Sequence, residues 1–96
     1  MNKYKLEFDK KASKEILDLN KPIREFILDE LERFINNFDD AYEKELIKIT
    51  KIKALKGEFK GLFRLKLRTY RVVYEKRRDK LIVLVLRVAH RRDAYM

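Results

Sequence analysis

The chain has 96 residues, no cysteine, one histidine and a formal net charge of +9 at pH 7. This length predicts a single domain that spans residues 1–96, and the lack of cysteine excludes disulfides and thiolate metal sites. No apolar run approaches the roughly 20 residues that span a bilayer, and no signal core opens the chain. We therefore expect a cytoplasmic protein without a membrane partner, a metal or another cofactor.

The positive charge is concentrated in the second half of the chain. Residues 1–50 hold 10 Lys/Arg against 12 Asp/Glu, a net charge of −2, whereas residues 51–96 hold 15 against 4, a net charge of +11. A half-domain this cationic attracts anions and favours a polyanionic partner such as nucleic acid.

The first half predicts one strand followed by two helices. Alternation of Tyr4, Leu6 and Phe8 with charged residues is typical of a half-buried strand. The apolar spacing over 12–19 and 23–38 predicts two amphipathic helices, which the Asn-Lys-Pro sequence at 20–22 separates. The stretch 41–54 fits either a further helix or a connector that lies over the core.

The second half predicts three strands joined by short turns. They cover 62–67, 70–76 and 81–89, and the last is the most apolar nine-residue run in the chain. Turns this short exclude crossover connections, so the three strands form an antiparallel meander. The expected fold is a two-layer α+β domain in the order β-α-α-β-β-β, with both helices on one face of the sheet and the first strand at its edge.

Cations and proton-exchanging side chains gather around this meander. Arg64, Lys66 and Arg68 are expected on one strand face, with Arg71 just after the turn and Arg87 on the neighbouring strand. The end of that strand adds His90, Arg91 and Tyr95. Such a surface suits a phosphodiester chain, because cations hold phosphates and planar side chains stack on unpaired bases.

Cleavage of RNA by its own 2′-OH needs a proton acceptor, a proton donor and charge stabilisation at phosphorus. The arginines supply only charge, so Lys66, His90 and Tyr95 are the candidates for proton transfer. From residue types alone, binding without catalysis ranks above catalysis, and a merely solvated sheet face is the simplest alternative.

The motifs of the second half resemble the RelE/ParE superfamily of toxin–antitoxin toxins. The matching segments, in order, are LKG at 55–57, LFRLKL at 62–67, YRVVY at 70–74, VLVLRV at 83–88 and HRRDAY at 90–95. The expected order of strands and helices also matches this family, so the resemblance covers nearly the whole chain.

The RelE branch implies a ribosome-dependent endoribonuclease that cuts mRNA in the decoding site. By this resemblance, Arg64 and Lys66 are strand cations and Arg71 contacts the scissile phosphate. Arg91 stabilises charge, and Tyr95 stacks on a base or assists proton transfer. His90 stands where some relatives carry a histidine. The resemblance also implies a cognate antitoxin as partner, beside ribosome and mRNA.

Two other functions remain open from the sequence. The ParE branch shares the fold but inhibits DNA gyrase and is not a nuclease. A basic RNA-binding module without toxicity is the third reading. Tyr95 and the Arg64–Lys66 pair favour the RelE branch.

Overall fold

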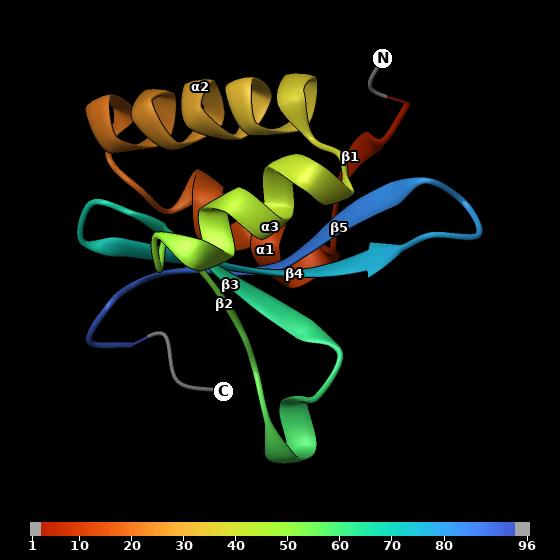
Figure 1. Cartoon of the computed structure of the whole chain (residues 1–96). Coiled ribbons are helices and arrows are strands. Elements are labelled where there is room, and N and C mark those ends of the chain that lie inside the picture. The colour runs from red at the N-terminus through yellow and green to blue at the C-terminus, as the bar shows by residue number, and fades with distance from the viewer. Residues whose placement is uncertain (1–2, 94–96) are drawn as a thin grey trace.

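The computed structural model describes residues 3–93 (Figure 1). The helices and strands follow one another as β1 (Lys5–Phe8), α1 (Lys10–Leu17), α2 (Lys21–Asn37), α3 (Asp40–Lys48), β2 (Ile52–Ala54), the short 3₁₀ helix η1 (Gly57–Phe59), β3 (Leu62–Leu67), β4 (Tyr70–Arg77) and β5 (Ile82–His90). No helix within 3–93 is long and apolar enough to cross a membrane.

The strands form one five-stranded sheet in the order β1-β5-β4-β3-β2. The pairs β2–β3, β3–β4 and β4–β5 are antiparallel, and β1 pairs with β5 in parallel. The predicted meander of the last three strands is confirmed, as is the edge position of the first strand. The α+β class is confirmed with them.

The segment that the sequence left open adds a helix and a strand to the predicted fold. It forms α3 and then β2, which joins the free edge of β3. Asp39 starts α3, because its carboxylate accepts from the Tyr42 N–H at 2.7 Å. The prediction of two helices and four strands was therefore incomplete.

Two further side-chain caps mark the starts of α1 and α2. The Asp9 carboxylate accepts from the Lys11 N–H at the start of α1. The Asn20 side chain accepts from the Ile23 N–H at the start of α2, where Pro22 occupies the first turn. Both satisfy backbone donors that have no partner within the helix.

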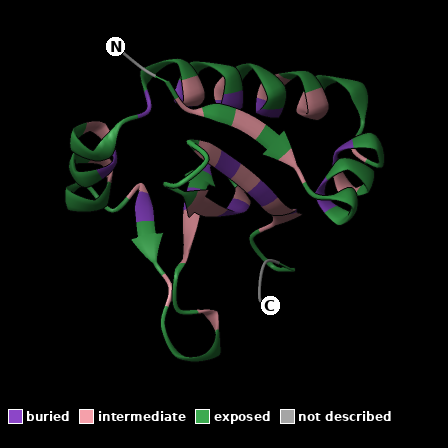
Figure 2. Ribbon diagram, turned by 90° about the vertical axis from the view of Figure 1, so that its right-hand side faces the viewer, coloured by how far each residue is buried: buried purple, intermediate pink, exposed green. Residues whose placement is uncertain are grey.

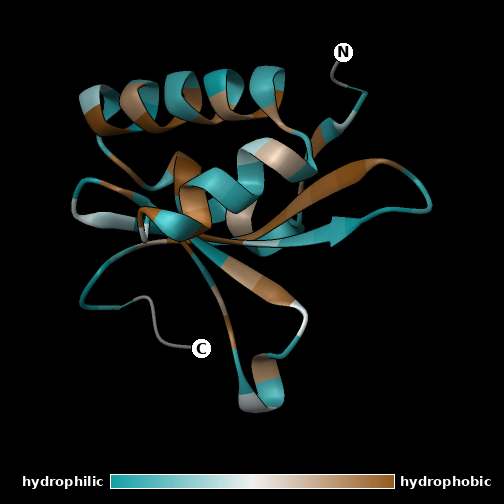
Figure 3. Ribbon diagram, viewed as in Figure 1, coloured by the Kyte–Doolittle hydropathy of each residue, from teal (hydrophilic) through white to brown (hydrophobic). Residues whose placement is uncertain are grey.

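The core lies between the helices and one face of the sheet. Figure 1 shows α2 along that side, and Figure 3 shows its apolar residues turned toward the sheet. Buried residues line the inner side of α2, whereas its outer side is exposed (Figure 2). The buried side chains of this core are Ala12, Ile16, Ile27, Leu31, Phe34, Phe38, Ile52, Leu65, Leu67, Val72, Tyr74, Val83, Val85 and Val88. Along the opposite side, here named the open face, no helix of residues 3–93 packs over the centre of the sheet (Figure 1).

A β-bulge in β5 decides which of its residues reach the open face. Val72 pairs with Val88 and Tyr74 with Val85, so β5 holds one residue more than β4 over this stretch. Val83 and Val85 point into the core, and without the bulge Arg87 would follow them. The extra residue reverses the alternation, which turns Arg87 to the open face and His90 to the helix side.

A buried polar network fixes α3 to β4. The two carboxylate oxygens of Glu43 accept from the Tyr74 hydroxyl at 2.6 Å and from the Lys76 ammonium at 2.5 Å. Burial, and then the hydrogen bond to Glu43, raise the pKa of Tyr74 far above its ordinary value. Hydrogen bonds from Lys76 and Arg78 lower the pKa of Asp40.

Candidate nucleic-acid interface

The register of the sheet sets four cations in two rows across the open face. One row runs Arg64–Val73–Arg87 and the next runs Lys66–Arg71–Ala89 over β3, β4 and β5. Paired residues in an antiparallel sheet share a face, so the predicted grouping of Arg64, Lys66, Arg71 and Arg87 is present. Val73 lies at its centre and is 1% exposed, although it stands outside the helix-side core.

Arg71 is the most constrained of these cations. Its guanidinium donates to the Arg68 carbonyl at 2.9 Å and to the Tyr70 carbonyl at 3.0 Å, which ties it to the β3–β4 turn. Burial lowers the pKa of Arg71, and the positive charges of Arg64 and Arg91 lower it further. An arginine stays charged at neutral pH, so the positive charges of this cluster repel one another. A bound anion would reduce this repulsion.

Arg91 reaches the cluster because the chain turns back after β5. Its backbone N–H donates to the Thr69 carbonyl at 2.7 Å, which holds the residue against the β3–β4 turn. Arg71 lies just after this turn, at the start of β4. Two arginines that are twenty positions apart in the sequence therefore meet at one end of the open face.

His90 lies on the other side of the sheet from these arginines. Its ring packs edge-on against Tyr70, with 5.5 Å between centroids and 81° between planes. Its Nδ1 accepts from the Arg92 N–H at 3.3 Å, so a neutral imidazole here carries its proton at Nε2. The structure does not bring His90 together with Lys66 and Arg71.

The expectation that Arg68 continues the row of Arg64 and Lys66 is wrong. Strand β3 ends at Leu67, and Arg68 adopts φ 57° in the turn. Its guanidinium lies over the Phe26 ring of α2, 4.0 Å from the centroid. Such a contact contributes about 0.5–1 kcal/mol at an exposed site, and here it joins the β3–β4 hairpin to the helix layer.

Arg87 faces the open side but is already paired with an acid. Its Nε donates to a Glu15 carboxylate oxygen at 2.9 Å, and the other oxygen accepts from the Val88 N–H at 2.8 Å. Strand β1 pairs with β5 only as far as Val85. Glu15 on α1 thus completes the backbone hydrogen bonding of β5 beyond that point. Tyr95, the remaining predicted residue, lies outside the described residues.

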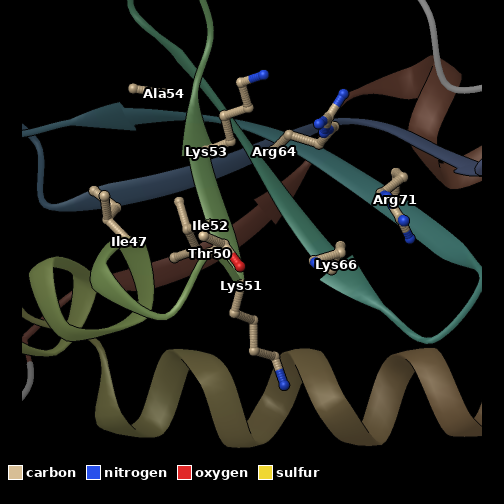
Figure 4. A pocket seen from close by; sticks show the side chains of 9 residues that line it. All are labelled: Ile47, Thr50, Lys51, Ile52, Lys53, Ala54, Arg64, Lys66 and Arg71. Carbon is tan, nitrogen blue, oxygen red and sulfur yellow. The ribbon is translucent and has the colours of Figure 1, made fainter.

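A cavity of about 500 Å³ crosses the open face. Figure 4 shows it running from Ile47 of α3, over β2 and β3, to Arg71 of β4. It is lined by Ile47, Thr50, Lys51, Ile52, Lys53, Ala54, Arg64, Lys66 and Arg71. The sequence prediction missed the residues from 47 to 54. The one signal available was the Lys51-Ile52-Lys53 alternation, which is typical of a half-buried strand.

The lining of this cavity carries only positive charges. It contains five cations and no carboxylate, and residues 3–93 contain no group of three or more metal-ligating side chains. Such a site can hold phosphate oxygens and stabilise charge that develops at phosphorus. Of the two cation types in the lining, lysine can exchange protons in proteins whereas arginine rarely does, and three lysines line the cavity, namely Lys51, Lys53 and Lys66.

A family model described as the ParE toxin of type II toxin–antitoxin systems, parDE, matches residues 6–95. The chain is a toxin of the RelE/ParE superfamily. A search of curated protein sequences finds no match. The resemblance stated from the motifs is confirmed, and the chain is a toxin of a toxin–antitoxin system.

Solved structures of RelE toxins superpose on this toxin over most of both chains. The RelBE complex of Mycobacterium tuberculosis matches with a TM-score of 0.63 and 29% identity, over 91% of this chain and 96% of that chain. The intact E. coli RelBE complex matches with a TM-score of 0.63 and 28% identity, over 92% and 96%. An archaeal RelE–RelB complex from Pyrococcus horikoshii shares the fold, with a TM-score of 0.68 and 23% identity over 98% and 100%.

Proposed function

We propose that this toxin is a ribosome-dependent endoribonuclease that cleaves mRNA and so inhibits translation. One observation carries the proposal: Arg64, Lys66 and Arg71 line a single cavity that has no carboxylate in its lining. Arg91 adds a further positive charge beside Arg71. The RelE structures that superpose on this chain support the nuclease branch of the superfamily.

In the proposed reaction the 2′-oxygen of one nucleotide attacks its own 3′-phosphate. The 2′-OH proton passes to a base, the bond from phosphorus to the 5′-oxygen breaks, and that oxygen receives a proton. The products are a 2′,3′-cyclic phosphate and a 5′-hydroxyl. Arg71 is proposed to hold the scissile phosphate, and Arg91 to stabilise the charge on the phosphorane. Lys66 and Tyr95 are proposed to transfer the protons.

The other predicted residues have smaller proposed roles. Arg64 binds the RNA backbone beside Lys66. Arg87 contributes a charge that Glu15 already offsets, and Arg68 contacts RNA only from the hairpin tip. His90 is proposed to support the Tyr70 ring at the base of the turn that carries Arg71.

The ribosome is proposed to orient the substrate. The cavity lies on an open sheet face, where a flexible single strand has many arrangements. In-line attack requires one of them, and holding reactants in that geometry lowers the barrier by several kcal/mol. We propose that the decoding site provides this constraint, and that the toxin therefore acts in the cytoplasm. A cognate antitoxin with an acidic segment would silence it by covering the +11 half of the chain.

The test adds purified toxin to ribosomes programmed with an mRNA and maps new 5′ ends by primer extension, with free mRNA in parallel. We expect new ends only where ribosomes are present. Arg71→Ala and Arg91→Ala should each reduce cleavage by at least tenfold without loss of fold. Cuts in free RNA would contradict the ribosome requirement, and undiminished cleavage by both variants would contradict the site.

Inhibition of DNA gyrase is the second candidate, because the matching family model is that of ParE. A supercoiling assay with purified gyrase separates the two functions. Inhibition of supercoiling together with intact mRNA on the ribosome would favour the ParE branch. This result would contradict the nuclease roles proposed for Lys66, Arg71 and Arg91.

A further inference from the structure

The cavity on the open face has two chemically different ends. Arg64, Lys66 and Arg71 stand at the β3–β4 end, and Ile47 of α3 forms the apolar end (Figure 4). The remaining two cations of the lining lie between these ends, Lys51 just before β2 and Lys53 within it. Ile47 is 37% exposed, so its side chain is accessible from the cavity. From β2 to β4 the sheet measures two strand spacings, about 9–10 Å. A nucleotide has the same division, with an anionic phosphate at one end and a largely apolar base at the other.

The edge of β2 adds hydrogen-bonding groups to the apolar end. The Lys66 N–H donates to the Lys51 carbonyl, and the Leu55 N–H donates to the Leu62 carbonyl, both at 2.9 Å. Because hydrogen-bonded residues alternate in an antiparallel pair, Ile52 and Ala54 direct their backbone N–H and C=O groups away from β3. Strand β2 is last in the sheet, and no described strand pairs with that outer edge.

We propose that the α3–β2 end of this cavity is a nucleobase subsite. It takes the base of one nucleotide of a single-stranded RNA whose phosphate lies on Arg64, Lys66 and Arg71. The apolar surface of Ile47 contacts the face of the base. The outward backbone groups of Ile52 and Ala54 bind its polar edge. This inference rests on the proposed binding of RNA and adds to it a site that selects among bases.

The experiment measures binding of the intact toxin to two single-stranded probes by fluorescence anisotropy. One is a pentanucleotide with 2′-O-methyl groups, which block attack by the 2′-oxygen. The other is the abasic backbone of the same length, with the same number of phosphates. The ratio of their dissociation constants reports contacts with bases alone, because the phosphate contacts are common to both.

We expect the wild-type toxin to bind the base-containing probe more tightly, and Ile47→Ala to lower that ratio about three- to fourfold, as expected for losing contact with roughly one methylene group. Ile49→Ala is the matched control, since Ile49 is 65% exposed but does not line the cavity. It should leave the ratio unchanged. Neither variant removes a cation, so both should keep the wild-type salt dependence.

Failure of this inference is distinguishable from failure of the proposed function. If both probes bind with equal affinity and a steep salt dependence, the toxin binds RNA and the base subsite is refuted. An equal decrease of the ratio in Ile47→Ala and Ile49→Ala would also refute the subsite, because Ile49 does not line the cavity. If neither probe binds, both the proposed binding of RNA by the free toxin and the base subsite are refuted.

Discussion

Removal of the Glu43 side chain should destabilise this toxin strongly, because Glu43 accepts from Tyr74 and Lys76 in a buried network. Its side chain is 5% exposed, and Lys76, which it pairs with, is 8% exposed. Glu43→Ala would leave the Tyr74 hydroxyl without this acceptor and the Lys76 ammonium with Asp40, at 3.2 Å, as its remaining carboxylate. The cost should therefore lie at the lower end of the range for a broken buried pair. Breaking a buried ion pair by removing one partner costs about 3–5 kcal/mol. Small domains unfold with about 5–15 kcal/mol, so the variant should lose a large part of its stability.

Urea unfolding followed by circular dichroism measures this loss. Glu45→Ala is the matched control: it removes the same side chain two residues later on α3, from a pair with Lys48 in which both side chains are more than two-thirds exposed. That substitution should cost about 0.5 kcal/mol or less. Glu43→Gln should fall between them, because its amide oxygen can still accept from the Tyr74 hydroxyl. Equal losses in Glu43→Ala and Glu45→Ala would refute the structural role of the buried network.

Three further results are expected. Replacing both Arg64 and Lys66 by Ala should reduce the slope of log affinity against log salt for single-stranded RNA by about 1.4, since each phosphate contact contributes roughly 0.7; an unchanged slope places these cations away from the interface. The raised pKa of Tyr74 gives a stabilisation that is complete below about pH 10 and is lost as the pH rises above it. Tyr74→Phe should therefore abolish the part of the alkaline loss of stability that Tyr74 causes. Urea unfolding midpoints between pH 8 and 11 measure this loss. Glu15→Gln keeps an oxygen for the Val88 N–H but places an amide against Arg87, so it should destabilise by about 1–3 kcal/mol, and a cost close to zero in thermal unfolding would contradict the pairing.

Alternation along β3 and β4 was enough to predict most of the cationic face. Leu65 and Leu67 are buried and Arg64 and Lys66 are turned to the other side, as the period of two requires. The same pattern failed for Arg68, because β3 ends at Leu67 and Arg68 itself adopts a positive φ in the turn. Hydrophobic spacing reports the face of a residue only while the strand continues.

The bulge in β5 explains the largest difference at the candidate site. The run from 82 to 90 is apolar at nearly every position, so no alternation marks where the extra residue falls. Its position nevertheless decides that Arg87 joins the cations and that His90 packs on Tyr70. The segment 41–54 is a comparable case, because the buried Glu43 in α3 looks like a surface residue until its partners on β4 are known.

The family match and the proposed activity depend on different parts of this molecule. The match to residues 6–95 covers the three helices, four strands and most of β1, so it describes the scaffold and not the proposed activity. A fold alone does not determine function. Under the proposed function, the activity depends instead on side chains of the open face, where Arg64, Lys66 and Arg71 line one cavity. These three residues are not part of the buried core cluster, so their substitution should test the proposed activity while leaving the fold intact.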